Sequence, residues 1–101
     1  RALIQRAQSD GLTIYGGTLT PFEGALYFTE EGETKRQAVN RWIRSSGAYD
    51  AVIDFDAIVR ASNNPRRFLP MYHPGDWLHP NDEGYRAMGE AIDLTLFAAS
   101  P

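Results

Sequence analysis

Two short apolar runs, separated by a long amphipathic segment, constrain the fold of this chain most strongly. Residues 12–15 and residues 51–55 are rich in β-branched and aromatic side chains, too short for helices and apolar enough for buried strands. Amphipathic segments precede the first run, separate the two and follow the second. Strands that alternate with helices indicate right-handed βαβ units in a parallel sheet covered on both faces. The sequence therefore predicts an α/β fold with two strands and about three helices.

Capping and stop signals set the expected bounds of the helices. The first ends near residue 8, because Asp10-Gly11 suits a helix C-terminus. The second begins at a capping box formed by Thr34 and Gln37 and ends before Gly47. The third runs from residue 81, where Asn81 is the N-cap, to residue 98. The residues expected to face the core from these last two helices are Val39, Trp42, Ile43, Tyr85, Met88, Ile92 and Leu96.

Two segments are predicted to be long loops. Residues 62–75 form a surface loop after one short turn capped by Asp56, and residues 18–33 follow the first strand. In open α/β sheets, ligands lie beyond the carboxyl ends of the strands. Thr18, Thr20 and Phe22 are therefore candidate substrate-binding residues, although their segment can also be a simple connection.

Length and charge restrict what the chain can be. A parallel sheet of two strands with both faces to cover is marginal in 101 residues. Residues 1–101 begin inside a predicted helix, so we expect one part of a single domain whose other strands lie before Arg1 or in a partner chain. The net charge of −3, without a basic patch, argues against nucleic acid. No apolar run is long enough to span a membrane, and the chain has no cysteine for a disulfide or a thiol nucleophile.

Asp76 and His79 lie three residues apart in a segment that cannot be helical. Pro80 disfavours the α region for His79, and Pro74-Gly75 marks a turn on the other side. In such a loop the carboxylate can accept a hydrogen bond from one imidazole nitrogen and leave the other facing outward. This is the arrangement of an orienting carboxylate and a general base.

Other functions remain open for the same loop. With His73, the pair offers three ligands that suit zinc, but even spacing of three converges on one face only in a helix, so metal binding at His73, Asp76 and His79 is the weaker hypothesis. The plainest alternative is a surface loop in which Asp76 bonds nearby amides. Trp77 is a candidate for lining a substrate pocket, whereas Leu78 is at least as suited to packing under the loop.

The segment Asp-Trp-Leu-His-Pro-Asn-x-x-Gly-Tyr, residues 76–85, resembles the last conserved block of the SGNH hydrolases, also called GDSL-type esterases and lipases. Residues 16–22 resemble the segment after the fourth strand in one secreted-type branch of that family, and the similarity runs from about residue 3 to residue 96. The resemblance implies a flavodoxin-like three-layer α/β/α sandwich and hydrolysis of a carboxylic ester through an acyl-serine, without a cofactor or metal. It makes His79 the general base and Asp76 its orienting carboxylate, and it is compatible with a secreted or periplasmic location.

Three parts of that family pattern are absent from this sequence. The nucleophilic serine of the family belongs to a Gly-Asp-Ser block, and the glycine and asparagine blocks complete the oxyanion hole. None of the serines here has that context: Ser9, Ser45, Ser46, Ser62 and Ser100. We therefore expect the C-terminal half of an esterase or lipase, inactive alone, that acts with its N-terminal half or another chain on a lipid, aryl or sugar ester. The alternative is a structural or binding fragment whose Asp-His pair is vestigial.

Overall fold

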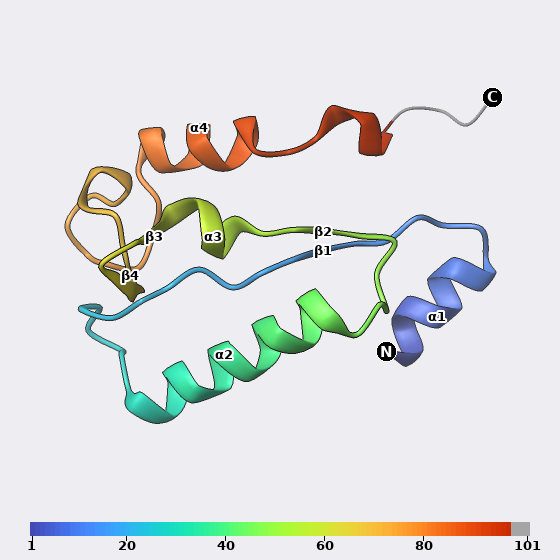
Figure 1. Ribbon diagram of the computed structural model, residues 1–101, viewed down its shortest axis with the longest axis horizontal. Coiled ribbons are helices and arrows are strands. Elements are labelled where there is room, and N and C mark those ends of the chain that lie inside the picture. Colours follow the sequence, from blue (N-terminus) through green and yellow to red (C-terminus); the bar gives the residue numbers. More distant parts are fainter. Residues whose placement is uncertain (98–101) are drawn as a thin grey trace.

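The computed structural model describes residues 1–97, and helices and strands alternate along them (Figure 1). Helix α1 (Ala2–Ser9) precedes β1 (Tyr15–Gly17), and α2 (Glu30–Ser45) connects β1 to β2 (Ala51–Ile53). The two strands pair in parallel over all three residues of each. The α/β class and the parallel strand pair are thus confirmed.

The strand pair lies between helices (Figure 1). Helix α2 runs along one side of it, and α4 (Asp82–Glu90) runs along the other. Both strands point towards the end of the molecule at which α4 begins. The loop that precedes α4 therefore lies beyond the carboxyl ends of the strands, where ligands bind in α/β proteins.

Strand β1 begins three residues later than predicted and includes both glycines. A Cβ atom on Gly16 would lie 2.6 Å from the ring of Tyr49, and one on Gly17 would lie 3.1 Å from the ring of Phe55. The glycines therefore let two aromatic rings approach the strand backbone, and they belong to the strand, whereas the sequence pattern placed its end before them.

Helix α2 begins earlier than predicted, at Glu30, because Thr29 is its N-cap. The side chain of Thr29 accepts a hydrogen bond from the amide of Gly32 at 2.9 Å. Three glutamates follow in the first turn, where the helix dipole favours anions. The capping box predicted at Thr34 is therefore wrong. No helix among residues 1–97 is long and apolar enough to cross a membrane.

A short helix, α3 (Phe55–Val59), follows β2. Its N-cap is Asp54, which accepts a hydrogen bond from the amide of Ala57 at 3.2 Å, and not Asp56 as predicted. Asp56 instead lies inside the first turn and is buried. Two carboxylates that are two residues apart thus have different roles, since Asp54 caps the helix and Asp56 enters the interior.

Residues 62–75 are not a single surface loop. Strands β3 (Arg60–Ala61) and β4 (Asn64–Phe68) form an antiparallel hairpin, and a 3-10 turn follows at Pro70–Tyr72. Phe68 is fully buried, and Arg66 forms ion pairs with glutamates outside the hairpin. Polar side chains dominate β4, so the sequence carried no apolar alternation to indicate a strand.

Helix α4 is shorter than predicted. Asn81 caps it as expected, but it ends at Glu90, and a 3-10 turn follows at Leu94–Phe97. The predicted end at Ala98 lies outside the described residues. Tyr85, placed by the helical pattern on the inward stripe, is 57% exposed, and Gly84 is the buried residue of this helix.

The predicted apolar core is only partly formed. Ile43 is buried, but Val39 and Trp42 of the same helix are exposed. A sheet of two short strands gives the helices little surface to pack against, which explains why the helical pattern overestimated burial. Among residues 1–97, the buried apolar side chains include Pro21, Ala25, Ile43, Ala48, Val59, Ala61 and Phe68.

A buried ion network occupies the space between α2 and α3. Arg36 is 3% exposed and Asp56 is 1% exposed, and their side chains form an ion pair at 2.6 Å. Glu33 binds Arg36 from one turn earlier at 2.8 Å. Arg44 and Arg60 bind the second oxygen of Asp56 at 2.8 and 2.9 Å. The charges are thus paired where a larger domain would bury hydrocarbon.

Candidate active site

Asp76 and His79 are in direct contact on the loop before α4. The Nδ1 atom of His79 lies 2.8 Å from Oδ2 of Asp76. The other carboxylate oxygen accepts the backbone N–H groups of Leu78 at 2.9 Å and of His79 at 3.1 Å. One oxygen of Asp76 therefore fixes the backbone of the loop, and the other fixes the imidazole ring.

The electrostatics of the pair determine the tautomer of His79. The hydrogen bond with His79, followed by those from the amides of Leu78 and His79, lowers the pKa of Asp76 from 3.8 to about 2. An ionised carboxylate can only accept a hydrogen bond, so Nδ1 of His79 must donate. In the neutral ring Nε2 then has a free lone pair, and the side chain of His79 is 66% exposed.

Helix α4 anchors this loop through Asn81. The backbone N–H of Asn81 donates to the carbonyl of Tyr72 at 2.8 Å, and its side-chain oxygen caps the helix at Gly84. Its side-chain nitrogen donates to the carbonyls of Met71 at 3.0 Å and of His73 at 3.3 Å. The segment that carries Asp76 and His79 is thus closed into a loop whose two ends meet at Asn81.

His73 does not join Asp76 and His79 as a third ligand. It is buried, and its Nδ1 atom accepts the backbone N–H groups of Gly75 at 3.0 Å and of Trp77 at 3.2 Å. Its ring lies 3.9 Å from that of Trp77. Within residues 1–97, no three His, Asp or Glu side chains come together in a way that could hold a metal ion. His73, Asp76 and His79 therefore do not form such a cluster in this part of the chain.

A hollow of about 450 Å³ lies beside the pair. Besides Asp76 and His79, it is lined by Gly75 and by Leu78 of the same loop, and by Gly24, Leu26 and Tyr27 from the segment before α2. A second hollow of about 360 Å³ shares Leu78 with the first and contains the predicted residues Thr20 and Phe22. Leu78 therefore separates two apolar depressions, one of which reaches His79.

Leu26 and Tyr27 were missed by the sequence analysis. Both are apolar or aromatic side chains that the fold leaves exposed, and both lie in the long loop before α2. The only sequence signal was that loop itself, because a long connection in a small domain tends to be functional.

Two other predicted substrate-binding residues do not face this hollow. Thr18 is buried, where its hydroxyl donates to Asp54 at 2.8 Å and accepts the amide of Asp56 at 2.9 Å. The ring of Trp77 packs on His73 and under the guanidinium of Arg67, 4.5 Å from its centroid. It lines a separate hollow beside the β3–β4 hairpin.

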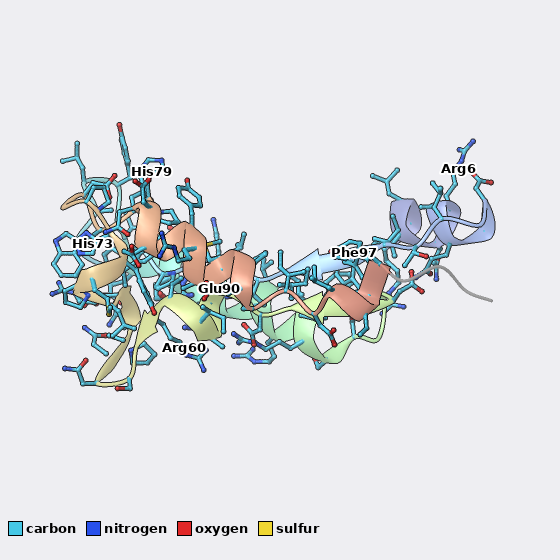
Figure 2. All side chains as sticks on the ribbon, turned by 90° about the horizontal axis from the view of Figure 1, so that it is seen from above. Arg6, Arg60, His73, His79, Glu90 and Phe97 are labelled. Carbon is cyan, nitrogen blue, oxygen red and sulfur yellow. The ribbon has the colours of Figure 1, made fainter. Side chains whose placement is uncertain are left out.

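The part of the chain that the structure describes provides no serine hydroxyl hydrogen-bonded to His79. Ser9 and Ser45 donate to carbonyls of their own helices, and Ser46 accepts the amide of Ala48. Ser100 lies outside the described residues. Figure 2 shows His79 and His73 near one end of the molecule, together with Arg60. This end of the fold therefore carries the contact between the His79 imidazole and the Asp76 carboxylate, but no serine of the described residues bound to it.

Comparison with known proteins gives one family. Residues 1–87 match the sequence profile of the GDSL-like Lipase/Acylhydrolase family. No curated protein matches the chain. The matched range extends from α1 into α4 and includes the loop with Asp76 and His79.

Proposed function

Because this chain belongs to the GDSL-like lipase/acylhydrolase family, a family of ester hydrolases, we propose that it contributes to a serine esterase site. In this site His79 is the general base and Asp76 is its orienting carboxylate. The nucleophilic serine comes from outside this chain, either from an N-terminal half of the same domain or from another chain. The whole protein then hydrolyses carboxylic esters through an acyl-serine intermediate.

In the proposed reaction, the serine hydroxyl attacks the carbonyl carbon of the ester. Nε2 of His79 accepts the hydroxyl proton and returns it to the oxygen of the leaving alcohol, which leaves an acyl-serine. A water molecule then attacks this acyl group in the same way, with His79 again as base, and the acid product and free serine result. Asp76 holds the ring in the tautomer that can accept the proton and stabilises the imidazolium that forms.

The observation that carries the proposal is the 2.8 Å contact between Nδ1 of His79 and Asp76. It leaves Nε2 outside the contact, on an exposed side chain that lines a hollow beyond the carboxyl ends of two parallel strands. The plain alternative, in which Asp76 only bonds nearby amides, accounts for one carboxylate oxygen but not for the one that binds the ring.

The hollows support an ester with an apolar part as substrate. Leu26, Tyr27 and Leu78 surround the space next to His79, and Leu78 continues into the depression that Thr20 and Phe22 line. Such walls suit an acyl chain or an aryl group, which gain free energy when they leave water. A lipid, aryl or acylated sugar ester fits this description.

Mutation of the pair in the complete enzyme tests the proposal. We expect His79→Ala to lower kcat/KM for a p-nitrophenyl ester by on the order of 10²–10⁴-fold, because proton transfer from the serine is lost. Asp76→Asn should lower it by as much or somewhat less, because an amide cannot stabilise the imidazolium. The losses should not multiply in the double variant, because the two groups act as one unit.

A matched control is Asp82→Asn, which removes an exposed carboxylate from the first turn of α4. We expect this variant to keep the activity of the unmodified enzyme. A double-variant loss near the product of the single losses would show that Asp76 and His79 act independently. Full activity of His79→Ala would mean that the pair is vestigial and that the chain contributes structure or binding only.

A further inference from the structure

We propose that His73 is a positioning residue, which sets the geometry of Asp76 and His79 by accepting two backbone hydrogen bonds from their loop. The inference rests on the proposed function wherever activity is the readout. The side chain touches neither the Asp76 carboxylate nor the His79 ring by hydrogen bond in the described chain. It acts through the backbone between them.

The contacts of His73 define its role. Nδ1 accepts the N–H groups of Gly75 and Trp77, the residues on either side of Asp76. Because both partners are donors, Nδ1 carries no proton, and in the neutral ring the proton is on Nε2. The buried ring also packs against Trp77 at 3.9 Å and lies 6.2 Å from the ring of Phe68. The imidazole is thus fixed between two backbone amides of the turn and the ring of Trp77.

The backbone at Trp77 needs this support. Trp77 has φ of +56°, the left-handed region that a residue with a bulky side chain seldom adopts. Residues persist in such conformations only when their surroundings hold them there. The N–H of Trp77 bonds Nδ1 of His73, and its ring stacks on the same imidazole. His73 therefore holds Trp77 both by its amide and by its side chain.

Trp77 in turn fixes the direction of the amides that bind Asp76. The next two N–H groups, those of Leu78 and His79, both donate to Oδ1 of Asp76. If Trp77 relaxed to negative φ, these amides would turn away and the carboxylate would lose the orientation that presents Oδ2 to the ring of His79. Misplacement of a catalytic group by about 1 Å can cost on the order of 10²-fold in rate.

Three substitutions at His73 separate the two possible roles of its ring in the complete enzyme. The side-chain oxygen of His73→Asn lies about where Nδ1 lies, whereas that of His73→Gln lies about where Nε2 lies. His73→Phe keeps an aromatic ring for stacking but accepts no hydrogen bond. We expect His73→Phe and His73→Gln to lower kcat by on the order of 10–100-fold with KM nearly unchanged, and His73→Asn to restore most of kcat.

A purely structural role would give a different pattern. Equal activity of the Asn and Gln variants, or an undiminished kcat in His73→Phe, would overturn the proposal, because the position of the acceptor would not matter. A loss carried by KM alone would also overturn it, since it would indicate a substrate contact.

A second measurement is independent of activity. The ¹⁵N chemical shifts of the His73 ring in the unmodified protein distinguish a protonated nitrogen from an unprotonated one. We expect an unprotonated Nδ1 and slow hydrogen exchange at the amides of Gly75 and Trp77. A protonated Nδ1 would overturn the role of His73 even in an active esterase. If the complete protein has no esterase activity but shows an unprotonated Nδ1 and slow exchange at these amides, the proposed function is contradicted and the hydrogen bonds of His73 are established.

Discussion

The carboxylate of Asp76 divides its two oxygens between the backbone and an imidazole. Oδ1 accepts two amides of the loop, and Oδ2 binds Nδ1 of His79. An aspartate that only stabilised its loop would bind the amides but not the imidazole. Hydrogen bonds from three donors keep the carboxylate ionised, which is the state that can hold and stabilise a base.

The pKa of Asp76 should respond to the loss of His79. In His79→Phe we expect the pKa of Asp76 to rise from about 2 towards 3.8, because the hydrogen bond from the ring is the largest cause of its lowering. The amides of Leu78 and residue 79 remain, so the rise should be incomplete. The ¹³C shift of the carboxyl carbon, followed against pH, measures it. Asp54, whose pKa is lowered to about 2 chiefly by Arg44, is the internal control and should not move.

The lowered pKa of Asp76 also predicts how the free energy of unfolding depends on pH. Because the pKa of Asp76 is lower in the folded protein, its ionised form favours folding above pH 3.8, and this contribution is lost as the pH falls towards 2. If the pKa of Asp76 is unchanged in His79→Phe, the hydrogen bonds from the two amides alone lower it, and the contribution of His79 to this pH dependence is absent.

One contact of the candidate site, between Asp76 and His79, was predictable because local signals determine the backbone there. The two prolines and Gly75 around Asp76 exclude a helix, so the sequence predicted that Asp76 and His79 lie in a loop where their side chains can meet. The direction of the Trp77 ring was not predictable, because its left-handed backbone is unusual for tryptophan and reverses the face on which the side chain lies. The buried position of Thr18 was not predictable for a different reason. Its partners, Asp54 and Asp56, are distant in sequence.

At the scale of elements, α4 approaches the turn before it very closely. A Cβ atom on Gly84 would lie 2.5 Å from the carbonyl oxygen of Tyr72 and 2.9 Å from Cβ of Pro80. The same carbonyl accepts the N–H of Asn81. Gly84 thus allows the helix to rest directly on the segment that closes the His79 loop.

Alanine substitution of the two glycines in α4 should have opposite effects. In Gly84→Ala the added methyl group pushes Tyr72 and Pro80 away from the helix. We expect this overpacking to lower the free energy of unfolding by about 1–3 kcal/mol. Gly89→Ala meets nothing within 4 Å and should stabilise the helix by up to about 1 kcal/mol. Urea unfolding of both variants gives the comparison. Equal stabilities would mean that the contact at Gly84 relaxes without cost.

The elements themselves were predictable where the signal is local. Helix periodicity and the cap at Asn81 identified α2 and α4, and the apolar run identified β2. The start of α2 was placed too late, because Thr29 caps the helix and the hydroxyl of Thr34 donates to the carbonyl of Glu30 inside it. The β3–β4 hairpin could not be found from its pattern, because its strand Asn64–Phe68 is polar and is held by ion pairs to residues far along the chain.

The whole molecule is organised around charge as much as around hydrocarbon. Asp56 forms ion pairs with Arg36 and Arg44 of α2 and with Arg60, the first residue of β3. Arg36 continues to Glu33 and to the carbonyl of Leu19 beyond β1. Sequence periodicity describes apolar faces and does not reveal such a network, which explains why the predicted core of aliphatic and aromatic stripes was incomplete.

Removal of the central charge should destabilise the fold strongly. We expect Asp56→Asn to lower the free energy of unfolding by about 3–5 kcal/mol, because the buried Arg36 would lose one of its two carboxylate partners, and Arg44 and Arg60 would lose theirs on Asp56. The control, Lys35→Ala, breaks an exposed ion pair with Glu31 on the same helix and should change stability by within about 0.5 kcal/mol. Urea unfolding at neutral pH compares them. A loss of similar size in both variants would contradict the importance given to the buried network.

The buried ions also affect the heat capacity of this protein. Exposure of apolar surface raises the heat capacity on unfolding, and exposure of polar surface lowers it. A core in which Arg36, Asp56 and Asn40 replace hydrocarbon therefore produces a smaller change than a core of the same volume built from leucine and valine. The free energy of unfolding then varies less steeply with temperature. The desolvation penalty of buried charges also falls on heating. The net contribution of the ion network to stability therefore becomes more favourable as the temperature rises.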